Sequence, residues 1–380
     1  MAKAVYVGVG SKARKMKKAY VGIGGKARKV KKMYIGVGGK ARLCYSAELE
    51  YVGTATPLSA ARISLAAASV GNYALFGGGR ADHNTYYATV DAYSASLTRT
   101  TPTQLRQAAY ELAAATIGNY ALFAGGSASS GAALASVDAY SNSLTRTSAG
   151  NLSVGKNRLS ATTIGNYALL GGGSGKGVKP SGIVDAYNAS LTKTSVADLS
   201  VARKDLAATA VGKYALFAGG YGDGYAVVVT DTVDVYDTSL TRTSASALSV
   251  QRYNLSATNV GNRALFGGGN CYNSTSSQAQ IVDAYDTSLT RTTPEKLSVN
   301  RGLAAATTVG DYALFGGGTY NQKNADVYDA SLTHTTMPFL YDSYSEGIAA
   351  TAVGDYALFG GGGMNLFYMD VSDAVNVYTA

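Results

Sequence analysis

The chain has 380 residues and a formal net charge of +9, from 33 Lys and Arg against 24 Asp and Glu. Residues 1–45 hold 13 of the basic residues and no acidic one, so the remainder has 20 basic and 24 acidic residues, a balance of about −4 (20 − 24). The positive charge is therefore local, which excludes a basic surface over the whole molecule as a sign of nucleic-acid binding. Two cysteines, Cys44 and Cys271, cannot form a disulfide framework, and no apolar run reaches the length of a signal-peptide core or a membrane span.

A 14-residue repeat fills residues 1–45. Each copy joins Tyr-Val-Gly or Tyr-Ile-Gly to Lys-Ala-Arg through a glycine-containing turn, which predicts a strand, a turn and a return strand, and together a small β-meander. With glycine at alternate positions, such a segment buries little of its own surface, so we expect it to need a partner. The candidate anchoring residues are Tyr6, Tyr20, Tyr34, Arg14, Arg28 and Arg42.

The charge of this segment has three interpretations: docking to other subunits or to copies of itself, contact with a phosphate backbone or another anionic polymer, and a solvated face. We favour docking, because the basic residues are not interleaved with stacking aromatics in a nucleic-acid motif. The repeat resembles N-terminal modules of phage tail and other virion-associated proteins of Gram-positive hosts. That resemblance implies attachment to a multi-subunit particle.

A second, longer repeat occupies the rest of the chain. The motif Val-Gly-Asn-Tyr-Ala-Leu-Phe-Gly-Gly-Gly at 70–79 recurs with small changes, and a Val-Asp-Ala-Tyr-like run follows each copy. Its first glycines are spaced by 47, 47, 47, 49, 49 and 44 residues, at Gly71, Gly118, Gly165, Gly212, Gly261, Gly310 and Gly354. A fixed period in this range indicates a repeat fold. The 46 glycines and 29 tyrosines, with no tryptophan, favour strands and turns and predict an all-β protein.

One repeat, residues 252–300, predicts one propeller blade. A first strand at 255–260 leads through the hairpin turn Gly261-Asn262 into a second strand at 263–266. A third strand at 281–285 and a fourth at 289–292 follow, joined by a short polar turn. Four antiparallel strands in about 47 residues form a blade, and seven stacked blades form a closed propeller.

The repeats resemble the kelch motif over residues 49–380. The resemblance is carried by Tyr236-Asp237 before Leu-Thr-Arg-Thr, by the run 248–252 that ends in Arg252, and by the glycine run after 264–266. Kelch repeats usually place Trp after the Tyr, whereas Thr243 stands near that position here. The resemblance implies a seven-bladed, kelch-like β-propeller.

The two ends of the long repeat predict how the ring closes. The last copy stops at 375–380 without a fourth strand, and residues 49–52 precede the first copy where such a strand belongs. We therefore expect the N-terminal strand to complete blade seven. The predicted domains are a basic β-rich stalk at 1–45 and a propeller at 46–380.

Comparison of the seven copies separates two faces. The turns between the first and second strands and between the third and fourth strands barely change, whereas the loops after the glycine triplets differ in sequence and length. Loops on a rigid scaffold commonly carry binding, so we expect recognition on the variable face, with neutral linkers as the alternative. The candidate ligand-binding residues are His83, Tyr86, Tyr87, Tyr221, Tyr225, Tyr272, Tyr320, Phe367 and Tyr368.

One basic residue recurs eight positions before the Val or Ile that ends the first strand. On one hypothesis these residues ring the central channel on the variable face and bind an anionic ligand. On the other, which we favour, they pair with the repeated aspartates Asp91, Asp185, Asp234, Asp283 and Asp326. The five basic residues are Arg62, Lys156, Arg203, Arg252 and Arg301.

Little in the sequence points to catalysis. His83 and His334 are the only histidines, they lie in different repeats, and no nucleophile motif, metal-ligand spacing or cofactor motif surrounds them. We expect a non-enzymatic, homo-oligomeric binding head of a virion, such as a phage tail fibre or receptor-binding protein. Residues 1–45 would bind other virion subunits, and the propeller loops would bind a host surface glycan, wall polymer or protein.

Two alternatives stay open. The first is a structural or decoration protein of a capsid or tail, in which the N-terminal segment carries the function. The second is a propeller enzyme acting on a glycan, which a convergent carboxylate or histidine cluster in the channel would favour.

Overall fold

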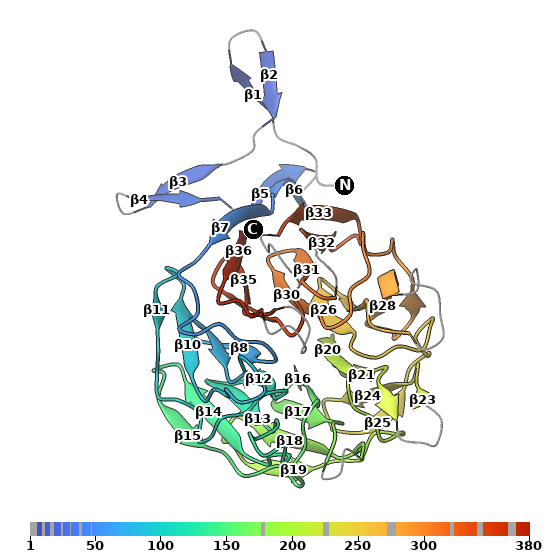
Figure 1. Cartoon of the computed structure of the whole chain (residues 1–380). Helices are drawn as coiled ribbons and strands as arrows, with labels where there is room; N and C mark the ends of the chain where they lie inside the picture. The colour runs from blue at the N-terminus through green and yellow to red at the C-terminus, as the bar shows by residue number, and fades with distance from the viewer. Residues whose placement is uncertain are drawn as a thin grey trace. The chain divides into compact units, whose positions relative to one another are not determined.

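The computed structural model places strands throughout the chain (Figure 1). Two compact units are distinguished, Met1–Glu50 with Thr379–Ala380, and Tyr51–Tyr378. The structure describes residues 6–9, 12–15, 19–23, 26–30, 32–37, 40–46, 48–175, 179–222, 228–271, 279–319, 323–339, 345–363 and 370–380.

The N-terminal unit contains three antiparallel hairpins, one in each 14-residue repeat. They pair β1 (Tyr6–Val9) with β2 (Lys12–Lys15), β3 (Tyr20–Ile23) with β4 (Lys26–Lys29), and β5 (Lys32–Val37) with β6 (Lys40–Ser46). The predicted strand and return strand of each repeat are confirmed, but the continuous meander is wrong, because each strand pair is a separate two-stranded sheet. A Cβ on Gly22 or Gly36 would meet nothing within 4 Å, so these strands have no packed neighbour at those positions.

The second unit is a seven-bladed propeller, as predicted (Figure 1). The first strands, which neighbour one another around the centre, are β8 (Ala66–Val70), β12 (Ala113–Ile117), β16 (Ser160–Ile164), β20 (Ala207–Val211), β26 (Ser256–Val260), β30 (Ala305–Val309) and β34 (Ala349–Val353). The second strands are β9 (Tyr73–Gly77), β13 (Tyr120–Ala124), β17 (Tyr167–Gly171), β21 (Tyr214–Ala218), β27 (Arg263–Gly267), β31 (Tyr312–Gly316) and β35 (Tyr356–Gly360).

The outer half of each blade is built from the third and fourth strands. The third strands are β10 (Val90–Ser94), β14 (Val137–Ser141), β18 (Val184–Asn188), β24 (Val233–Asp237), β28 (Val282–Asp286), β32 (Asn324–Asp329) and β36 (Val375–Thr379). The fourth are β11 (Arg99–Thr100), β15 (Arg146–Ser148), β19 (Lys193–Ser195), β25 (Arg242–Ser244), β29 (Arg291–Thr292), β33 (His334–Pro338) and β7 (Glu50–Thr54). A further short pair, β22 (Tyr221–Gly222) with β23 (Val228–Val229), lies in the loop between β21 and β24.

The N-terminal strand closes the ring, which confirms the prediction from the chain ends. Blade seven has the order β34-β35-β36-β7. The Tyr51 hydroxyl donates to Asn376 Oδ1 at 3.0 Å, and the Ala55 N–H donates to the Val375 carbonyl at 2.9 Å. Both ends of the chain therefore contribute to one sheet, which leaves no unpaired sheet edge at the junction.

Each blade is joined to the connection that leads into it by a tyrosine hydroxyl, and in six blades this tyrosine meets a phenylalanine ring of the same blade. In blade four, the rings of Phe217 and Tyr236 meet edge to face at 5.8 Å, and the Tyr236 hydroxyl donates to the Ala197 carbonyl at 2.7 Å. Ala197 lies in the connection that leads into the blade, so the bond fixes that connection. The hydroxyl bond recurs in every blade, from Tyr93, Tyr140, Tyr187, Tyr285, Tyr328 and Tyr378.

The glycine triplets permit close packing between blades. A Cβ on Gly77 would lie 2.8 Å from Cε1 of Phe123 in the next blade, and a Cβ on Gly78 would lie 2.5 Å from the Ala109 carbonyl oxygen. Contacts this short are not tolerated, so the small side chain is required by packing and by the φ of +72° at Gly78.

The turn between the third and fourth strands differs from the prediction. Leu289 was expected to begin a strand, but β29 begins at Arg291, and Leu289 has φ +62°. This backbone directs the leucine side chain against a buried core cluster that includes Phe266 and Tyr285. Packing therefore decides the conformation, and Leu97, Leu144, Leu191, Leu240 and Leu332 repeat it.

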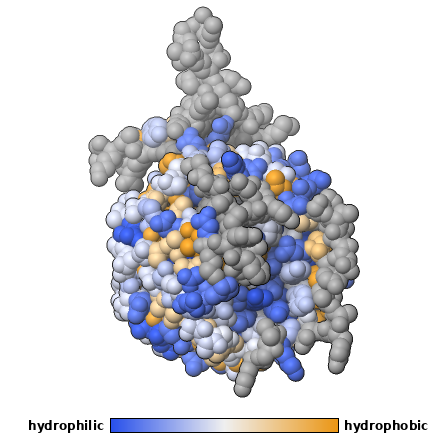
Figure 2. Space-filling model, in the orientation of Figure 1, coloured by the Kyte–Doolittle hydropathy of each residue, from blue (hydrophilic) through white to orange (hydrophobic). Residues whose placement is uncertain are grey.

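The surface of the propeller gives no sign of a large apolar patch on the face seen in Figure 2, where apolar residues form scattered spots among hydrophilic ones. The exposed large apolar residues described in this unit are Val52, Val154, Val201, Val228 and Leu303. No helix among the described residues is long and apolar enough to cross a membrane.

Candidate functional site at the channel mouth

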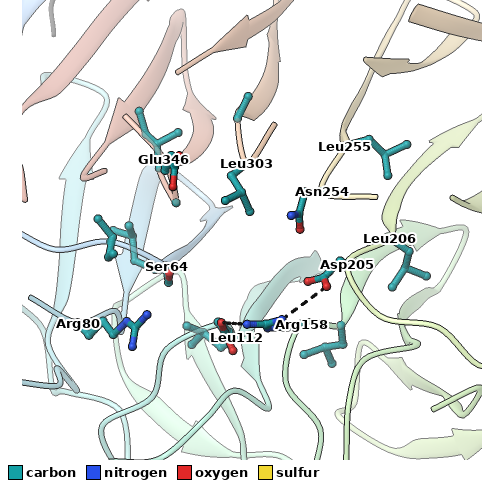
Figure 3. Close-up of a pocket in the computed structure, with 17 residues that line it drawn as sticks. Ser64, Arg80, Leu112, Arg158, Asp205, Leu206, Asn254, Leu255, Leu303 and Glu346 are labelled. Atoms are coloured by element: carbon teal, nitrogen blue, oxygen red, sulfur yellow. Dashed lines mark ion pairs between the residues drawn. The ribbon is translucent and has the colours of Figure 1, made fainter. Parts of the chain in front are cut away.

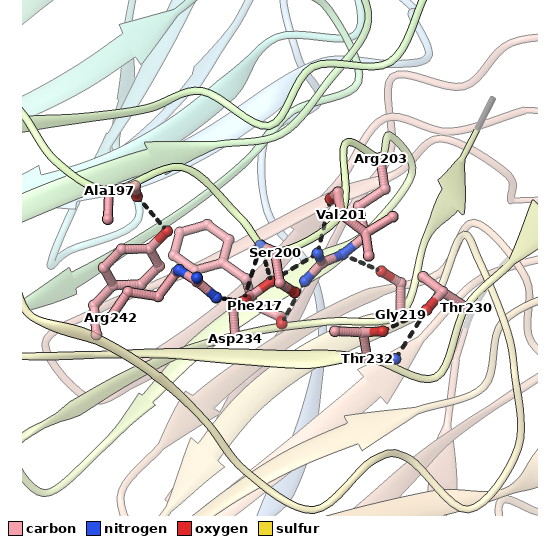
Figure 4. Close-up of polar contacts among 11 residues, drawn as sticks. Ala197, Ser200, Val201, Arg203, Phe217, Gly219, Thr230, Thr232, Asp234 and Arg242 are labelled. Atoms are coloured by element: carbon pink, nitrogen blue, oxygen red, sulfur yellow. Dashed lines mark hydrogen bonds and ion pairs between the residues drawn. The ribbon is translucent and has the colours of Figure 1, made fainter.

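The recurrent basic residues lie in buried ion pairs. In blade four, Arg203 donates to Asp234 Oδ2 at 2.7 Å and to the carbonyls of Gly219 and Phe217 at 2.8 and 3.0 Å (Figure 4). Neither charged side chain has exposed surface. The same pairing joins Arg62 to Asp91, Lys156 to Asp185, Arg252 to Asp283, and Arg301 to Asp326.

These pairs confirm the interpretation in which the basic residues bind the repeated aspartates. The other hypothesis, in which these basic residues ring the channel and bind an anionic ligand, is wrong, because side chains with no exposed surface cannot reach a ligand in the channel. Burial lowers the pKa of Arg203, and the charge of Asp234 opposes that effect. The role of the pair is structural, since Asp234 also accepts from the Ser200 N–H at 3.1 Å and from Arg242 at 2.9 Å.

Two blades depart from this network. In blade two, Ala109 stands at the position of the recurrent base, and Asp138 pairs with Arg106 at 2.9 Å instead. In blade seven, the corresponding residues are Ser345 and Asn376, and Tyr51 takes the place of the second base. In blade two another arginine thus replaces the missing base, and in blade seven the aspartate and its bases are replaced together, so neither blade leaves the aspartate position with an unpaired charge.

A closed ring of backbone hydrogen bonds surrounds the channel on the side of the variable loops. Seven residues, one in each blade, donate an N–H to the carbonyl of the equivalent residue in the preceding blade, at 2.7 to 3.2 Å. All seven have φ between +53° and +63°. We call Ser64, Glu111, Arg158, Asp205, Asn254, Leu303 and Gly347 the mouth ring.

The mouth ring lines a cavity of about 500 Å³ (Figure 3). Beneath it lies a second ring, one position further along the chain, whose residues are buried except for the half-buried Ala304: Leu65, Leu112, Leu159, Leu206, Leu255, Ala304 and Ile348. Arg80 and Glu346 complete the wall. The cavity therefore has an apolar floor and a polar wall, and its size suits one or two sugar units or a molecule of similar dimensions.

The charges on the wall are unevenly distributed. Arg158 pairs with Glu111 at 3.0 Å and with Asp205 at 3.7 Å, so three adjacent blades share one ionic cluster. Glu346 lies across the opening from Asp205 (Figure 3), and among the described residues its carboxylate has no hydrogen bond or ion pair. Burial raises the pKa of Glu346, and burial also raises the pKa of Asp205 despite the opposing charge of Arg158.

Arg80 is held by an aromatic contact. Its guanidinium lies 4.6 Å from the centre of the Tyr110 ring, and Tyr110 stacks on Tyr86 at 5.4 Å. Arg80 is 8% exposed and has no ion pair among the residues that the structure describes. The cavity wall thus carries three carboxylates and two guanidinium groups, a net charge of −1 (2 − 3).

The mouth ring differs in one respect from the other non-glycine residues with positive φ. In the turns between third and fourth strands the residue is leucine in six blades, because its side chain packs in the core. In the mouth ring the backbone is equally constant, but no two blades carry the same residue. Packing therefore does not dictate the side chains of the mouth ring. Residues other than Gly, Asn and Asp are disfavoured in this conformation, and such outliers are concentrated at functional sites.

The predicted loop residues that the structure describes do not line this cavity. His83 is exposed beside Asp82, whose carboxylate accepts from the Asn84 and Thr85 N–H groups at 2.7 and 2.6 Å. Tyr86 reaches the cavity wall only through Tyr110 and Arg80, and Tyr87 is partly buried. The rings of Tyr221 and Tyr253 meet edge to face at 5.7 Å, and Lys204 lies 5.3 Å from the centre of the Tyr221 ring. Tyr225, Tyr272, Tyr320, Phe367 and Tyr368 lie outside the described residues.

The predicted anchoring residues occupy equivalent places in the three hairpins. Tyr6 and Tyr20 are opposite Lys15 and Lys29, and Tyr34 is opposite Leu43. Arg14, Arg28 and Arg42 face the residue that follows each tyrosine. Tyr20 and Tyr34 are 59% and 58% exposed.

The sequence contains a signal for the mouth ring that the prediction missed. The ring position follows the recurrent base by two residues and precedes the recurrent leucine by one, as in Arg203-Lys204-Asp205-Leu206. A position that carries a different residue in every copy, directly before one that is mostly leucine, marks a side chain free of packing. Arg80 and Glu346 have no such signal, because each occurs once.

Within the described ranges, no three His, Cys, Asp or Glu side chains are grouped to hold a metal ion. No protein-family model and no curated protein sequence matches the chain. The protein is therefore characterised by its fold, an all-β propeller of seven blades closed by its N-terminal strand.

Proposed function

We propose that this protein is a non-enzymatic binding head that recognises a surface glycan or wall polymer at the channel mouth and the surrounding variable loops. The observation that carries the proposal is the mouth ring, in which a constant backbone presents seven different residues to one cavity. A binding site needs such a rigid frame with freely varied side chains.

The form of the cavity supports a carbohydrate ligand. Sugar rings have apolar C–H faces and hydroxyl edges, which suit the leucine floor and the polar wall respectively. Leu303 is 38% exposed in a backbone conformation that disfavours leucine, so both its exposure and its φ of +55° are costs that contact with a ligand would offset.

The N-terminal hairpins support attachment to a larger particle. Isolated two-stranded hairpins are marginally stable, and Tyr20, Val21 and Tyr34 are exposed on them. Together with the resemblance of the 14-residue repeat to virion-associated modules and of the blades to kelch repeats, this favours a phage tail fibre or receptor-binding protein, homo-oligomeric and located in the virion.

A binding experiment tests the proposal. Full-length protein, residues 46–380 and residues 1–46 are each applied to an array of bacterial wall polymers and glycans and to candidate host cells. The first two should bind the same targets. The variant Asn254→Gly with Leu303→Gly keeps the left-handed backbone but removes two side chains of the mouth ring, and should lose binding. Asn72→Gly, in a hairpin turn of the constant face, is the matched control and should bind normally.

If residues 46–380 bind nothing while residues 1–46 assemble with virion components, the binding head is refuted and the structural or decoration role is favoured.

The carboxylates of Asp205 and Glu346 favour a second candidate, a glycan-cleaving enzyme, because such enzymes use two carboxyl groups and the pKa of both is raised here. We rank it lower because Asp205 is engaged by Arg158. New reducing ends in glycan incubated with the protein would reverse that order.

A further inference from the structure

The charge at the channel mouth narrows the chemistry of the ligand. The recurrent arginines that a basic channel would require are buried against aspartates. The charged groups that remain at the cavity are Glu111, Asp205 and Glu346 against Arg80 and Arg158. The wall is therefore acidic by one charge, which disfavours an anionic ligand in the cavity itself.

Within this set, the three carboxylates differ in whether an arginine engages them. Arg158 is shared between two carboxylates, at 3.0 and 3.7 Å, so its charge is fully engaged. Arg80 is held over the face of Tyr110, and its backbone is bridged to Ile63. The carboxylate of Glu346 has neither an ion pair nor a hydrogen bond among the described residues, although the residue is partly buried.

The neighbours of Glu346 make room for a ligand rather than for a protein counter-ion. The next residue is Gly347, the only residue of the mouth ring without a side chain. Blades five, six and one contribute the uncharged Asn254, Leu303 and Ser64 to the ring. Glu346 thus stands on the arc of the wall where no basic side chain lines the cavity except Arg80.

We propose that the part of the ligand bound in the channel mouth carries a protonated amine, as in an unacetylated amino sugar, with Glu346 as its counter-ion. This inference rests on the proposed function and specifies its ligand. The ammonium group donates to the Glu346 carboxylate, Asn254 and Ser64 bind neighbouring hydroxyls, and the C–H face of the ring lies against Leu303 and the leucine floor. Ionised Glu346 is costly in the empty cavity, since burial raises its pKa, and an ammonium group would remove that cost.

Two oligosaccharides that differ only in this group test the inference. The full chain is titrated calorimetrically with a tetrasaccharide of β-1,4-linked glucosamine and with the matching N-acetylglucosamine tetrasaccharide, at pH 6 and low salt. The amine form should bind about tenfold more tightly, as expected for one charge-assisted hydrogen bond. The preference should diminish at 0.5 M salt, because salt screens the pair.

Variants identify the residue responsible. Glu346→Gln retains the shape of the side chain and should bring the two affinities within about twofold, with the N-acetyl form bound as before. Glu295→Gln removes a 70% exposed carboxylate outside the cavity and should leave the preference intact. If both variants keep the melting temperature of the unsubstituted protein, a change in affinity reflects the loss of the carboxylate and not a loss of folding.

Equal affinity for the two tetrasaccharides, a preference for the N-acetyl form, or a preference that survives Glu346→Gln would overturn the inference. So would the absence of binding by both. The proposed function is judged separately by the glycan and cell array, since a wall polymer bound there without amine preference refutes the ammonium site and leaves the binding head standing.

Discussion

The backbone N–H of Ser64 donates to the carbonyl of Gly347 at 2.7 Å, and this bond joins blade one to blade seven at the channel mouth. It completes a circle of seven equivalent bonds on the inner side of the propeller. Strand β7 closes the same junction at the periphery through Tyr51 and Asn376. The ring is thus closed twice, once by side-by-side strands and once by the mouth ring.

Substitution of Gly347 tests the inner closure. A Cβ at this position would lie 2.9 Å from the Ser64 nitrogen, and the φ of +63° adds strain, so Gly347→Ala should lower the free energy of unfolding by about 2–3 kcal/mol. Gly131→Ala is the control, because its φ is +76° with nothing within 4 Å, and should cost only about 1 kcal/mol. Chemical denaturation measures both, and equal losses would show that the bond contributes nothing.

Removal of strand β7 tests the outer closure. A variant lacking residues 47–56 should melt at least about 5 °C lower, because the buried Tyr378 and strand β36 lose their cover. A variant that lacks only residues 1–46 should retain the melting temperature of the propeller. Identical melting curves for the two truncations would refute closure by this strand.

The two kinds of left-handed leucine predict opposite effects of one substitution. Leu303→Gly removes an exposed side chain from a strained backbone and should leave stability unchanged or raise it by up to about 1 kcal/mol. Leu332→Gly relieves the same strain but removes core contacts, and should cost about 2 kcal/mol. Chemical denaturation measures both changes. If Leu303→Gly lowers the free energy of unfolding as much as Leu332→Gly does, the functional role of the mouth ring is contradicted.

Two aspartates should respond oppositely to pH. Burial alone would raise the pKa of Asp326, but Arg301 and the Ser298 N–H outweigh it and the pKa is lowered. Its charge therefore contributes stability above the unfolded value near 3.9, and that stability is lost as pH falls through the folded value. Asp326→Asn should accordingly cost about 3–5 kcal/mol at pH 7, the usual loss when one partner of a buried pair is removed.

The pKa of Asp205 shifts in the opposite direction on folding, because burial raises it. Its ionised form costs stability at neutral pH, and the cost is relieved as pH falls through the raised folded value towards the unfolded one. Asp205→Asn should therefore stabilise the protein at pH 7, an advantage that disappears at acid pH, while weakening ligand binding. Urea unfolding at pH 7 and pH 4 distinguishes the two variants, and a loss of stability for Asp205→Asn at pH 7 would contradict this account.

The blade count, the strand order and the closure by the N-terminal strand could be predicted because each depends on patterns that the sequence repeats. The pairing of Arg203 with Asp234 was accessible in the same way, since both recur at a fixed interval. The left-handed backbone conformation of Leu289 could not be predicted, because leucine has no preference for turns. Only the packing of its side chain on a neighbouring core cluster determines this conformation. The charge of the cavity was also inaccessible, since it depends on which bases are buried and on Arg80 and Glu346, which no repeat marks.

The mouth ring has a consequence for how such a protein can change over generations. Several repeats have the same length and nearly the same sequence, so recombination between them would exchange whole blades without disturbing the bonds between ring residues. Each exchange would replace the ring residue and the variable loop of one blade and leave the propeller framework as it was. Diversity at the site is therefore available through duplication and shuffling of the gene, as well as through point mutation.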